Sequence, residues 1–408
     1  MPGTQFSAFD YFADLFVLCL VVVPTFYLLP WSWARRTLLT LSGAYLLFLI
    51  APRLAVFYVA FWLIVALEQR LVAWVGERTG GGYVLAICIG TCLAPMLIWK
   101  LFPVGFIVWF NTFFDARLWQ VSSYVGSIDA VRAIILPLGL SFASFRAVDL
   151  LVQSYLGTVS ARPVGDILFY GFFPPVQVIG PVIEFAEVDA QSHRAERLRL
   201  DDYRFAFTQV VVGAVKVFVL AVPLASSIDL FIVYRSNSAW RLWIELIMYA
   251  WWFYLNFSGY SDMAIGVARV FGFKLKPNFS RPYTRTNPQA FWNSWHMSLT
   301  RFAQRNVFVP LGGMRGRTQY VALAATMMVI ALWHDISWPL VLFGIYHTCG
   351  LIGWRKLNEV RPAATAPSLR LTIGKGILLF MFVTVSLPLL TLSFGEIGRF
   401  YGSLIGIR

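Results

Sequence analysis

Residues 321–346 read VALAATMMVIALWHDISWPLVLFGIY, and this stretch decides the fold. Two titratable side chains, His334 and Asp335, interrupt an otherwise apolar run. A helix rises about 1.5 Å per residue, so one unbroken helix over 318–353 would be about 54 Å long, whereas the hydrocarbon core of a bilayer is about 30 Å thick. We therefore expect a helix break, with Ser337 (or Asp335) as N-cap and Pro339 in the first turn of the next helix.

The position of His334 follows from this break. The preceding helix would run over about 320–333, a length of about 21 Å that is too short to cross a bilayer. His334 should then lie below the membrane surface, where an ionisable side chain marks a functional site by default. A neutral imidazole can take a proton from a hydroxyl acceptor as a general base. The spacing equally allows a structural histidine whose partner is a neighbouring carbonyl.

The composition indicates an all-α, multi-pass membrane protein. Of the 408 residues 59% are hydrophobic and only 13% are charged, and the mean hydropathy is +0.69. A soluble domain could not hide so much apolar surface in one core. Apolar segments recur at 12–29, 37–50, 52–68, 82–101, 102–114, 131–143, 166–182, 206–226, 239–258, 318–333, 338–353 and 372–393.

Several of these segments are too short, or too interrupted by proline and glycine, to cross a bilayer alone. Residues 166–182 (DILFYGFFPPVQVIGPV) contain a Pro-Pro pair and two glycines. They predict a re-entrant or bent element, which is tolerated at membrane depth only when it is buried in protein or lines a cavity. No internal repeat is present, and we expect one integral domain over 1–408.

The basic residues indicate the orientation of the chain. The net charge is +13, but Lys and Arg cluster in short loops, as the positive-inside bias requires, so nucleic-acid binding is not indicated. Trp31–Arg36 (WSWARR) should be cytoplasmic, which places the N-terminus outside, with no cleaved signal peptide. The region Arg269–Arg317 has nine basic residues and no acidic one. It is suited to an acidic partner, a phosphate-bearing donor or anionic lipid headgroups.

Neither the four cysteines nor the charged loop 187–204 indicates a metal site or a disulfide. Cys19, Cys88, Cys92 and Cys349 form no CxxC pair, so we expect small buried hydrophobic side chains rather than a zinc site or a disulfide framework. The loop 187–204 mixes charges of both signs, and its His193 is expected to be exposed.

A second histidine stretch covers 277–313. Asn287-Pro288 should start an amphipathic helix near the cytoplasmic interface. Its apolar face would comprise Phe291, Trp292, Trp295, Leu299 and Phe302. His296 lies beside that face, either lining the mouth of a pore or snorkelling to the surface. His347 lies within the helix that follows His334, and we expect it to serve packing or to support the site indirectly.

Polar residues also interrupt the apolar run 251–266 (WWFYLNFSGYSDMAIG). They are Asn256, Ser258, Tyr260, Ser261 and Asp262. The cluster predicts a polar lining at membrane depth. A helix end at the membrane interface is the alternative.

These motifs resemble those of a known family. FWNSWHMSLTRF (291–302) and ALWHDISWPLVLFGIYH (331–347) resemble the paired signature of the membrane-bound O-acyltransferases. Further blocks resemble its bacterial cell-envelope branch, which includes proteins of alginate O-acetylation and teichoic-acid D-alanyl transfer: SFASFRAVDLLVQSYLG (141–157), FFPPVQVIGPV (172–182), FSGYSDMAIGVARVFGF (257–273) and PNFSRPY (277–283). The resemblance covers about 100–350.

The resemblance implies about eleven helices, some re-entrant or broken, around a funnel that narrows within the bilayer. It implies acyl transfer in a bacterial inner membrane to a hydroxyl of an envelope polysaccharide, or to a relay partner. The family's catalytic histidine corresponds to His334, and its second motif histidine to His296. Further candidates for lining the tunnel are Asp335, Asn256, Ser258, Asp262, Trp295 and His347.

The implied donor is an acyl thioester, acetyl-CoA or the phosphopantetheine of an acyl-carrier protein, on the cytoplasmic side. A periplasmic acyltransferase can act as partner, the remaining surface contacts membrane lipids, and no bound cofactor or metal is implied. The chain departs from the family pattern where Asp335 replaces a glycine and where Gln304 and Arg305 replace Arg-Asp. These departures leave the donor and the acceptor open.

Two other classes of protein also stay open. A transporter or flippase uses broken helices with intramembrane polar groups, although many transporters carry an internal repeat that this chain lacks. A non-catalytic scaffold of a polysaccharide modification or export complex is the other class.

Overall fold

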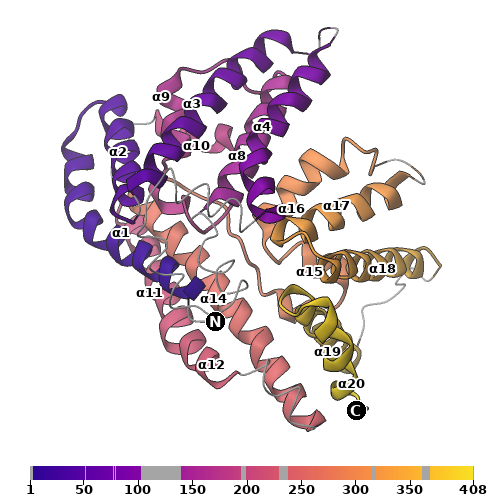
Figure 1. The fold of residues 1–408 in the computed structure, drawn as a ribbon. Helices are drawn as coiled ribbons and strands as arrows, with labels where there is room; N and C mark the ends of the chain where they lie inside the picture. The colour runs from indigo at the N-terminus through magenta and orange to yellow at the C-terminus, as the bar shows by residue number, and fades with distance from the viewer. Residues whose placement is uncertain are drawn as a thin grey trace. The chain divides into compact units, whose positions relative to one another are not determined.

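The computed structural model describes residues 3–50, 52–76, 78, 80–102, 139–193, 199–228, 238–314, 316, 318–360 and 368–407. The predicted segments 102–114 and 131–143 therefore lie largely outside the described residues. Within them the chain is helical without a strand (Figure 1). The α-helices are α1 (Gly3–Leu28), α2 (Ser32–Ile50), α3 (Pro52–Val75), α4 (Gly81–Leu101), α8 (Leu140–Tyr155), α9 (Val164–Gly171), α10 (Phe185–Ser192), α11 (Leu200–Ala214), α12 (Val222–Ser227), α14 (Ala239–Val270), α15 (Pro288–Trp292), α16 (Met297–Ala303), α17 (Thr318–His334), α18 (Trp338–Val360), α19 (Leu369–Ser386) and α20 (Phe394–Leu404).

Shorter helical elements of other types connect some of these helices. Three are 3₁₀ turns: η1 (Pro174–Val176), η3 (Pro282–Thr284) and η5 (Leu387–Leu390). Two are π-helical: η2 (Val215–Ala221), which joins α11 to α12, and η4 (Gln304–Phe308), which follows α16. π-Helical turns inside α-helices are rare and often lie at functional sites.

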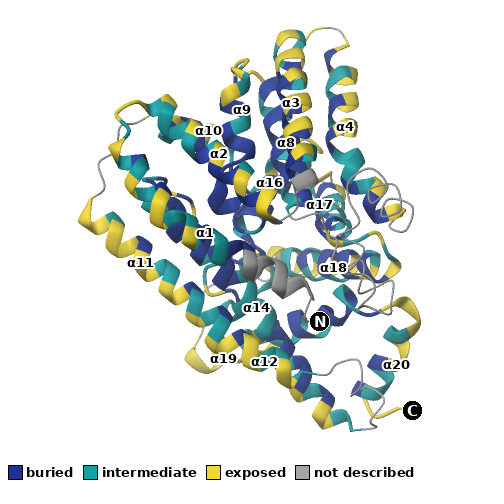
Figure 2. Ribbon diagram, turned by 60° about the vertical axis from the view of Figure 1, so that its left-hand side comes forward, coloured by how far each residue is buried: buried dark blue, intermediate teal, exposed yellow. Residues whose placement is uncertain are grey.

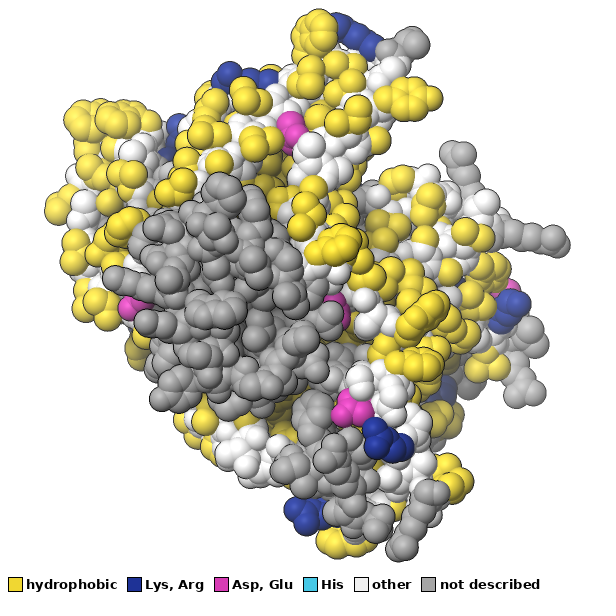
Figure 3. All heavy atoms as spheres, viewed as in Figure 1, with side chains coloured by type: hydrophobic (Ala, Val, Ile, Leu, Met, Phe, Trp, Pro, Cys, Tyr) yellow, Lys and Arg dark blue, Asp and Glu magenta, His cyan; other side chains and the backbone are white. Residues whose placement is uncertain are grey.

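The helices confirm a multi-pass membrane protein. Five described stretches are long and apolar enough to span a bilayer: Tyr11–Leu28, Ala55–Val75, Gly81–Leu101, Leu200–Ser227 and Leu369–Leu390. Many large apolar side chains on them are exposed, for example Leu20 at 76% and Leu378 at 72%. Hydrophobic side chains dominate the described surface in the space-filling view, and charged ones are few (Figure 3). Such a surface requires lipid as its solvent.

The chain groups into two compact units. The first comprises Met1–Thr208 and Ala264–Leu275, and the second comprises Gln209–Met263 and Lys276–Arg408. Helices α11 and α14 therefore each contribute residues to both units.

In the first unit α3, α4 and α8 pack side by side (Figure 1). Most of α8 is buried, as Figure 2 shows. Arg146 on this helix is 1% exposed. Its guanidinium carbon lies 4.4 Å from the centroid of the Tyr170 ring and 5.5 Å from that of the Trp62 ring. Gly171, at the end of α9, is required because a Cβ there would come within 2.5 Å of the Trp62 indole.

The predicted bent element is confirmed in the first unit. Helix α9 ends at Gly171, and the Pro-Pro pair then forms the 3₁₀ turn η1. Almost all of 166–182 is buried. An eight-residue helix is only about 12 Å long and cannot cross a bilayer, so protein contacts must satisfy this backbone.

In the second unit, the first half of α14 packs against the end of the chain. The shared core is formed by Leu242, Leu246, Tyr249, Ala250, Leu387, Leu392, Phe400 and Leu404. Helices α17 and α18 pack against each other, where Gly344 meets Met328 and Ala331. The short helix α15 packs against α18, and α16 packs against α17.

Two glycines set the crossing of α11 and α14. A Cβ on Gly213 would lie 2.5 Å from the carbonyl oxygen of Gly259, and one on Gly259 would lie 2.6 Å from Cγ2 of Val217. The two backbones therefore approach closely, as small residues allow in membrane helices. One turn further along, this contact brings Lys216 against Asp262. Helix α11 otherwise exposes most of its side chains (Figure 2).

The cysteine prediction holds only in part. Cys88 and Cys92 are buried, but Cys19 is half-buried and Cys349 is exposed. Cys92 also has a polar partner, because its Sγ donates to Oε2 of Glu68 at 3.3 Å. Cys349 lies on α18 at a position that faces away from the protein core, which sequence composition alone does not reveal.

Candidate active site

A cavity in the second unit brings together the two motif histidines. Its volume is about 470 Å³, which includes space open to solvent, and its lining is mainly aromatic and aliphatic. Its walls are Phe253, Phe257, Phe291, Trp292, Trp295, His296, Leu299, Ile330, His334, Phe343, His347, Val383, Ser386, Leu387 and Leu390. Three of the four histidines of the chain thus line one apolar cavity.

The predicted helix break at His334 is confirmed. Helix α17 ends at His334, α18 begins at Trp338, and Ser337 accepts the first backbone hydrogen bond from Val341 at 3.1 Å through its carbonyl. The His334 side chain is exposed at the protein surface. His334 therefore lies at a helix terminus on the cavity wall, with its imidazole accessible from outside the protein.

Asp335 does not line this cavity. Its side chain is half-buried, and none of the ion pairs between described residues includes it. The role of Asp335 therefore stays a prediction.

The second motif differs from the predicted amphipathic helix. The helix does begin at Pro288, where Oδ1 of Asn287 caps the backbone N–H of Ala290 at 2.8 Å, but it ends after one turn at Trp292. A new helix, α16, starts at Met297. The prediction of one continuous interfacial helix is therefore wrong.

All five residues of the expected apolar face are buried in protein: Phe291, Trp292, Trp295, Leu299 and Phe302. The spacing of apolar residues correctly predicted which side chains avoid water. Such spacing cannot show whether those side chains contact lipid or the protein core.

His296 lies at the break between α15 and α16, in a left-handed conformation with φ 41° and ψ 53°. Only two non-glycine residues of the described chain have a positive φ, His296 and Arg281. Such backbone costs of the order of 1 kcal/mol and persists only where the surroundings impose it. The His296 side chain is 1% exposed, so of the two expected roles snorkelling to the surface is wrong.

Asn278 holds the break in place. Its backbone carbonyl accepts the N–H of Met297 at 2.8 Å, and its Oδ1 lies 3.1 Å from Nδ1 of His296. The backbone N–H and the hydroxyl of Ser298 donate to the same Oδ1 at 3.2 Å and 2.8 Å. Asn278 lies in the PNFSRPY block, but no residue pattern marks it as part of the site. The only signal in the sequence was an asparagine directly after a proline.

The environment keeps His296 neutral. The ring packs edge-on against Phe257, with centroids 4.7 Å apart, and lies 5.8 Å from the Trp333 ring. Burial lowers the pKa of His296 well below its usual value of 6.5, and the nearby His334 and Arg301 lower it further. A neutral imidazole retains one nitrogen that can accept a proton.

His347 is buried on α18 at the inner wall of the cavity. Its Nε2 lies 3.0 Å from the hydroxyl of Ser386, and its ring contacts Trp292, Phe343 and Phe382. The ring is therefore packed in the protein, and a supporting role in the site stays a prediction.

The polar cluster on α14 does not line the same cavity. Ser258 is fully buried, and its Oγ has no hydrogen-bond partner among the described residues. Asn256 is half-buried. Asp262 forms an ion pair in which Oδ2 lies 2.5 Å from Nζ of Lys216. The expected lining role of these three residues stays a prediction. The sequence does not predict Lys216 as the partner of Asp262. No residue pattern shows where the segment that carries Lys216 contacts α14.

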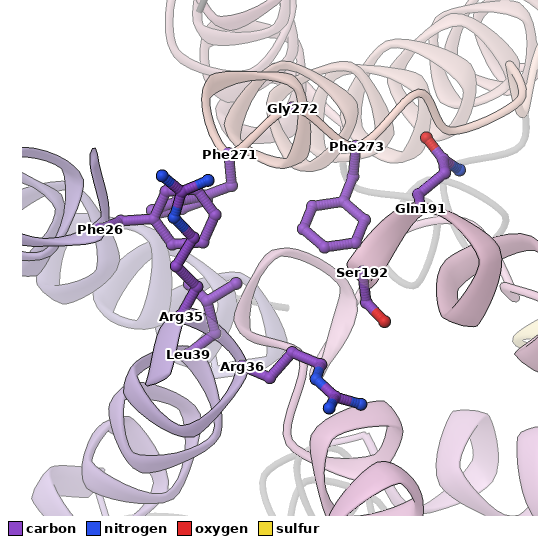
Figure 4. A pocket seen from close by; sticks show the side chains of 9 residues that line it. All are labelled: Phe26, Arg35, Arg36, Leu39, Gln191, Ser192, Phe271, Gly272 and Phe273. Atoms are coloured by element: carbon purple, nitrogen blue, oxygen red, sulfur yellow. The ribbon is translucent and has the colours of Figure 1, made fainter. Parts of the chain in front are cut away.

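The first unit has its own smaller cavity, of about 340 Å³, and Figure 4 shows the side chains that line it. Arg35 lies over the Phe26 ring, 5.2 Å from its centroid, and donates through Nε to the carbonyl of Leu29 at 2.8 Å. Arg36 forms an ion pair with Asp166. The described lining of this cavity includes the hydroxyl of Ser192 but no histidine, cysteine or carboxylate.

A carboxylate–histidine group lies near Arg36 in the same unit. Asp166, Asp189 and His193 have ligand atoms within 4.8 Å of one another. Arg36 pairs with Asp166 and Arg162 pairs with Asp189, so each carboxylate already has a cationic partner and we assign no metal there. His193 is exposed, as predicted, with Nε2 3.3 Å from Oδ1 of Asp189.

The helical membrane fold and the two motif histidines on one cavity are those expected of a membrane-bound acyltransferase. Comparison with known sequences supports this class. Residues 87–392 match the model of the membrane-bound O-acyltransferase family, and the chain belongs to that family.

Three relatives illustrate the bacterial members. The chain is 29% identical over 299 residues to the probable alginate O-acetylase AlgI of Azotobacter vinelandii, covering 72% of this chain and 60% of the relative. It is 28% identical over 249 residues to the peptidoglycan O-acetyltransferase of Helicobacter pylori, covering 53% and 47%. It is 30% identical over 244 residues to the teichoic acid D-alanyltransferase of Streptococcus thermophilus, covering 55% and 58%. The chain thus spans less than two thirds of the length of each of these relatives.

Proposed function

We propose that this protein is an O-acyltransferase that moves an acetyl or aminoacyl group from a thioester donor to a hydroxyl of a cell-envelope glycopolymer. The observation that carries the proposal is the convergence of His334 and His296 on one cavity in a chain of the membrane-bound O-acyltransferase family. The named relatives modify alginate, peptidoglycan and teichoic acid, and envelope polymers are their common feature.

The proposed reaction assigns the base role to His334. Its imidazole takes the proton of the acceptor hydroxyl while the oxygen attacks the thioester carbonyl carbon. A C–O bond forms, the C–S bond breaks, and the thiolate leaves. The proton on His334 then neutralises the thiolate, so that the enzyme returns to its starting state. The acceptor hydroxyl belongs either to the polymer or to a relay partner that carries the acyl group onward.

The apolar cavity supports this chemistry. Aromatic rings around His296 exclude water, which would otherwise hydrolyse the thioester. A low local dielectric also strengthens the hydrogen bonds that stabilise the developing oxyanion. We propose that the donor, acetyl-CoA or a carrier-protein phosphopantetheine, enters from the cytoplasm and the acceptor from outside, in the cytoplasmic membrane of a bacterium with the N-terminus outside. A separate periplasmic acyltransferase would complete transfer to the polymer.

The test is His334→Ala, with His193→Ala as the matched control, because His193 is an exposed histidine outside the cavity. Cells that express each variant are compared for base-labile acyl groups on their envelope polymers and for the amount of polymer. Loss of acylation with unchanged polymer, in His334→Ala only, supports the proposal. Retained acylation overturns it. Loss of the polymer itself would instead favour a transporter or an export scaffold.

A further inference from the structure

The carboxamide of Asn278 lies at the centre of a buried hydrogen-bond network. Asn278 is 1% exposed, and so is His296. The amide Nδ2 donates to Oγ of Ser261 at 3.0 Å, while Oδ1 receives the backbone N–H and the hydroxyl of Ser298. These contacts connect α14, the extended segment at Asn278 and the start of α16.

The network determines which way the amide of Asn278 faces. A backbone N–H can only donate, so the amide atom 3.2 Å from the nitrogen of Ser298 must be the oxygen. This atom is also the one that lies 3.1 Å from Nδ1 of His296. A carboxamide oxygen can only accept, and therefore Nδ1 must carry the proton in this contact.

The nearby hydroxyl does not change this assignment. Oγ of Ser298 lies 3.4 Å from Nδ1 of His296 but only 2.8 Å from Oδ1 of Asn278. Its single proton is directed to the shorter contact. If Nδ1 were the unprotonated nitrogen, it would face the carboxamide oxygen acceptor to acceptor at 3.1 Å, which is a repulsive arrangement.

We infer that Asn278 is a positioning residue that holds neutral His296 in the Nδ1–H tautomer, so that Nε2 is the acceptor atom. The left-handed backbone of His296 supports the inference, because strained backbone persists where several contacts impose it. The N–H of Met297 and the side chain of Ser298 both bind Asn278, and these two residues directly follow His296.

The charged and titratable groups around His296 favour its neutral form. They are His334 at the end of α17 and Arg301 on α16, and both lower the pKa of His296, as does burial. Helix α14 contributes the Phe257 ring and the segment after Asn278 contributes Phe279, neither of which titrates. A neutral imidazole has only two tautomers, and Asn278 selects between them.

The consequence for catalysis rests on the proposed function. In the Nδ1–H tautomer, Nε2 of His296 can accept a hydrogen bond from a hydroxyl or from the imidazole of His334. The opposite tautomer would present an N–H at that place. Asn278 would therefore act on the reaction through His296, without touching the substrate.

The experiment observes the tautomer directly. The chain has four histidines, so protein labelled with ¹³C and ¹⁵N in histidine rings, in lipid bilayers, yields few imidazole signals. His296→Gln identifies the signal of His296. At neutral pH we expect a protonated Nδ1 and an unprotonated Nε2. An Nε2–H tautomer, or a protonated ring, overturns the inference.

Two variants separate positioning from structural support. Asn278→Ala should release the tautomer and lower acyl transfer by about 10- to 100-fold, the loss that follows when a residue that orients a metal-binding histidine is removed. Ser261→Ala is the matched control, since it removes a partner of Nδ2 but leaves Oδ1 held by Ser298. It should retain the wild-type tautomer and transfer. An equal loss of transfer in Ser261→Ala with an unchanged tautomer overturns the positioning role.

A third variant distinguishes positioning of His296 from structural support even if Asn278→Ala does not fold. Asn278→Asp has nearly the same shape, and its carboxylate beside Nδ1–H should raise the pKa of His296. The acidic limb of the pH–activity profile should then move to higher pH. A uniformly lower rate with an unmoved limb would indicate a structural role and overturn the inference. These results do not depend on His334→Ala, so the proposed function and the tautomer can fail separately.

Discussion

Nζ of Lys216 lies 2.5 Å from Oδ2 of Asp262, and this ion pair joins the apolar stretch Leu200–Ser227 to α14. The side chains are 23% and 18% exposed, so both charges are largely withdrawn from solvent. Lys216 belongs to the π-helix η2, which interrupts that stretch. The close crossing of Gly213 and Gly259 brings the two charges together.

Lys216→Ala should destabilise the protein because it leaves the Asp262 carboxylate without its cation. Removing one partner of a buried pair costs up to about 3–5 kcal/mol, and partial exposure here reduces the expected loss to about 2 kcal/mol. The double variant Lys216→Leu/Asp262→Leu should recover most of this loss. Thermal unfolding in detergent measures both. A single variant as stable as the wild type would show that the pair is not needed.

Gly259→Val should disrupt the crossing of α11 and α14, since even a Cβ at this position lies 2.8 Å from the carbonyl oxygen of Gly213. Overpacking typically costs about 1–3 kcal/mol, and here backbone cannot move aside as a flexible side chain would. Gly353→Ala on α18 is the control, because nothing lies within 4 Å of a Cβ there. It should maintain or slightly raise the unfolding midpoint. Equal effects in the two variants would contradict the packing argument.

Arg146→Met should be tolerated. Arg146 is buried and rests on the rings of Trp62 and Tyr170, but its Nε and Nη2 have no hydrogen-bond partner among the described residues. An apolar side chain of similar length avoids the cost of burying the charge and can stabilise by about 1–4 kcal/mol. Arg146→Ala, which leaves a cavity, should instead lose about 2–5 kcal/mol. An equal loss in both variants would mean that the charge itself is required.

The stability of the protein should fall as the pH drops below about 6.5. Because burial holds the pKa of folded His296 below its usual value of 6.5, the unfolded chain binds more protons in acid than the folded chain does. The loss begins at the unfolded pKa and continues down to the folded pKa, at up to about 1.4 kcal/mol per pH unit. The unfolding midpoint of His296→Gln should depend less on pH than that of His193→Gln. Equal dependence would contradict the assignment.

Much of the local structure could be predicted from residue pattern. The break after His334, the bend at Pro174-Pro175 and the start of a helix at Pro288 all follow from lengths, prolines and caps, which act over a few residues. The break at His296 could not be predicted in this way. It depends on Asn278, 18 residues before His296 in the chain. The backbone carbonyl and the side-chain oxygen of Asn278 accept the backbone N–H groups of Met297 and Ser298 at the start of the next helix.

The sequence by itself determined the class of protein and the identity of the two motif histidines. Hydropathy, helix length and motif residues are local or additive properties, and they need no knowledge of which segments touch. Only the tertiary structure decided that His296 and His334 share a cavity, that Lys216 neutralises Asp262, and that Asn278 contacts His296. Each of these facts is a contact between residues distant in the chain, and such contacts depend on how the helices pack.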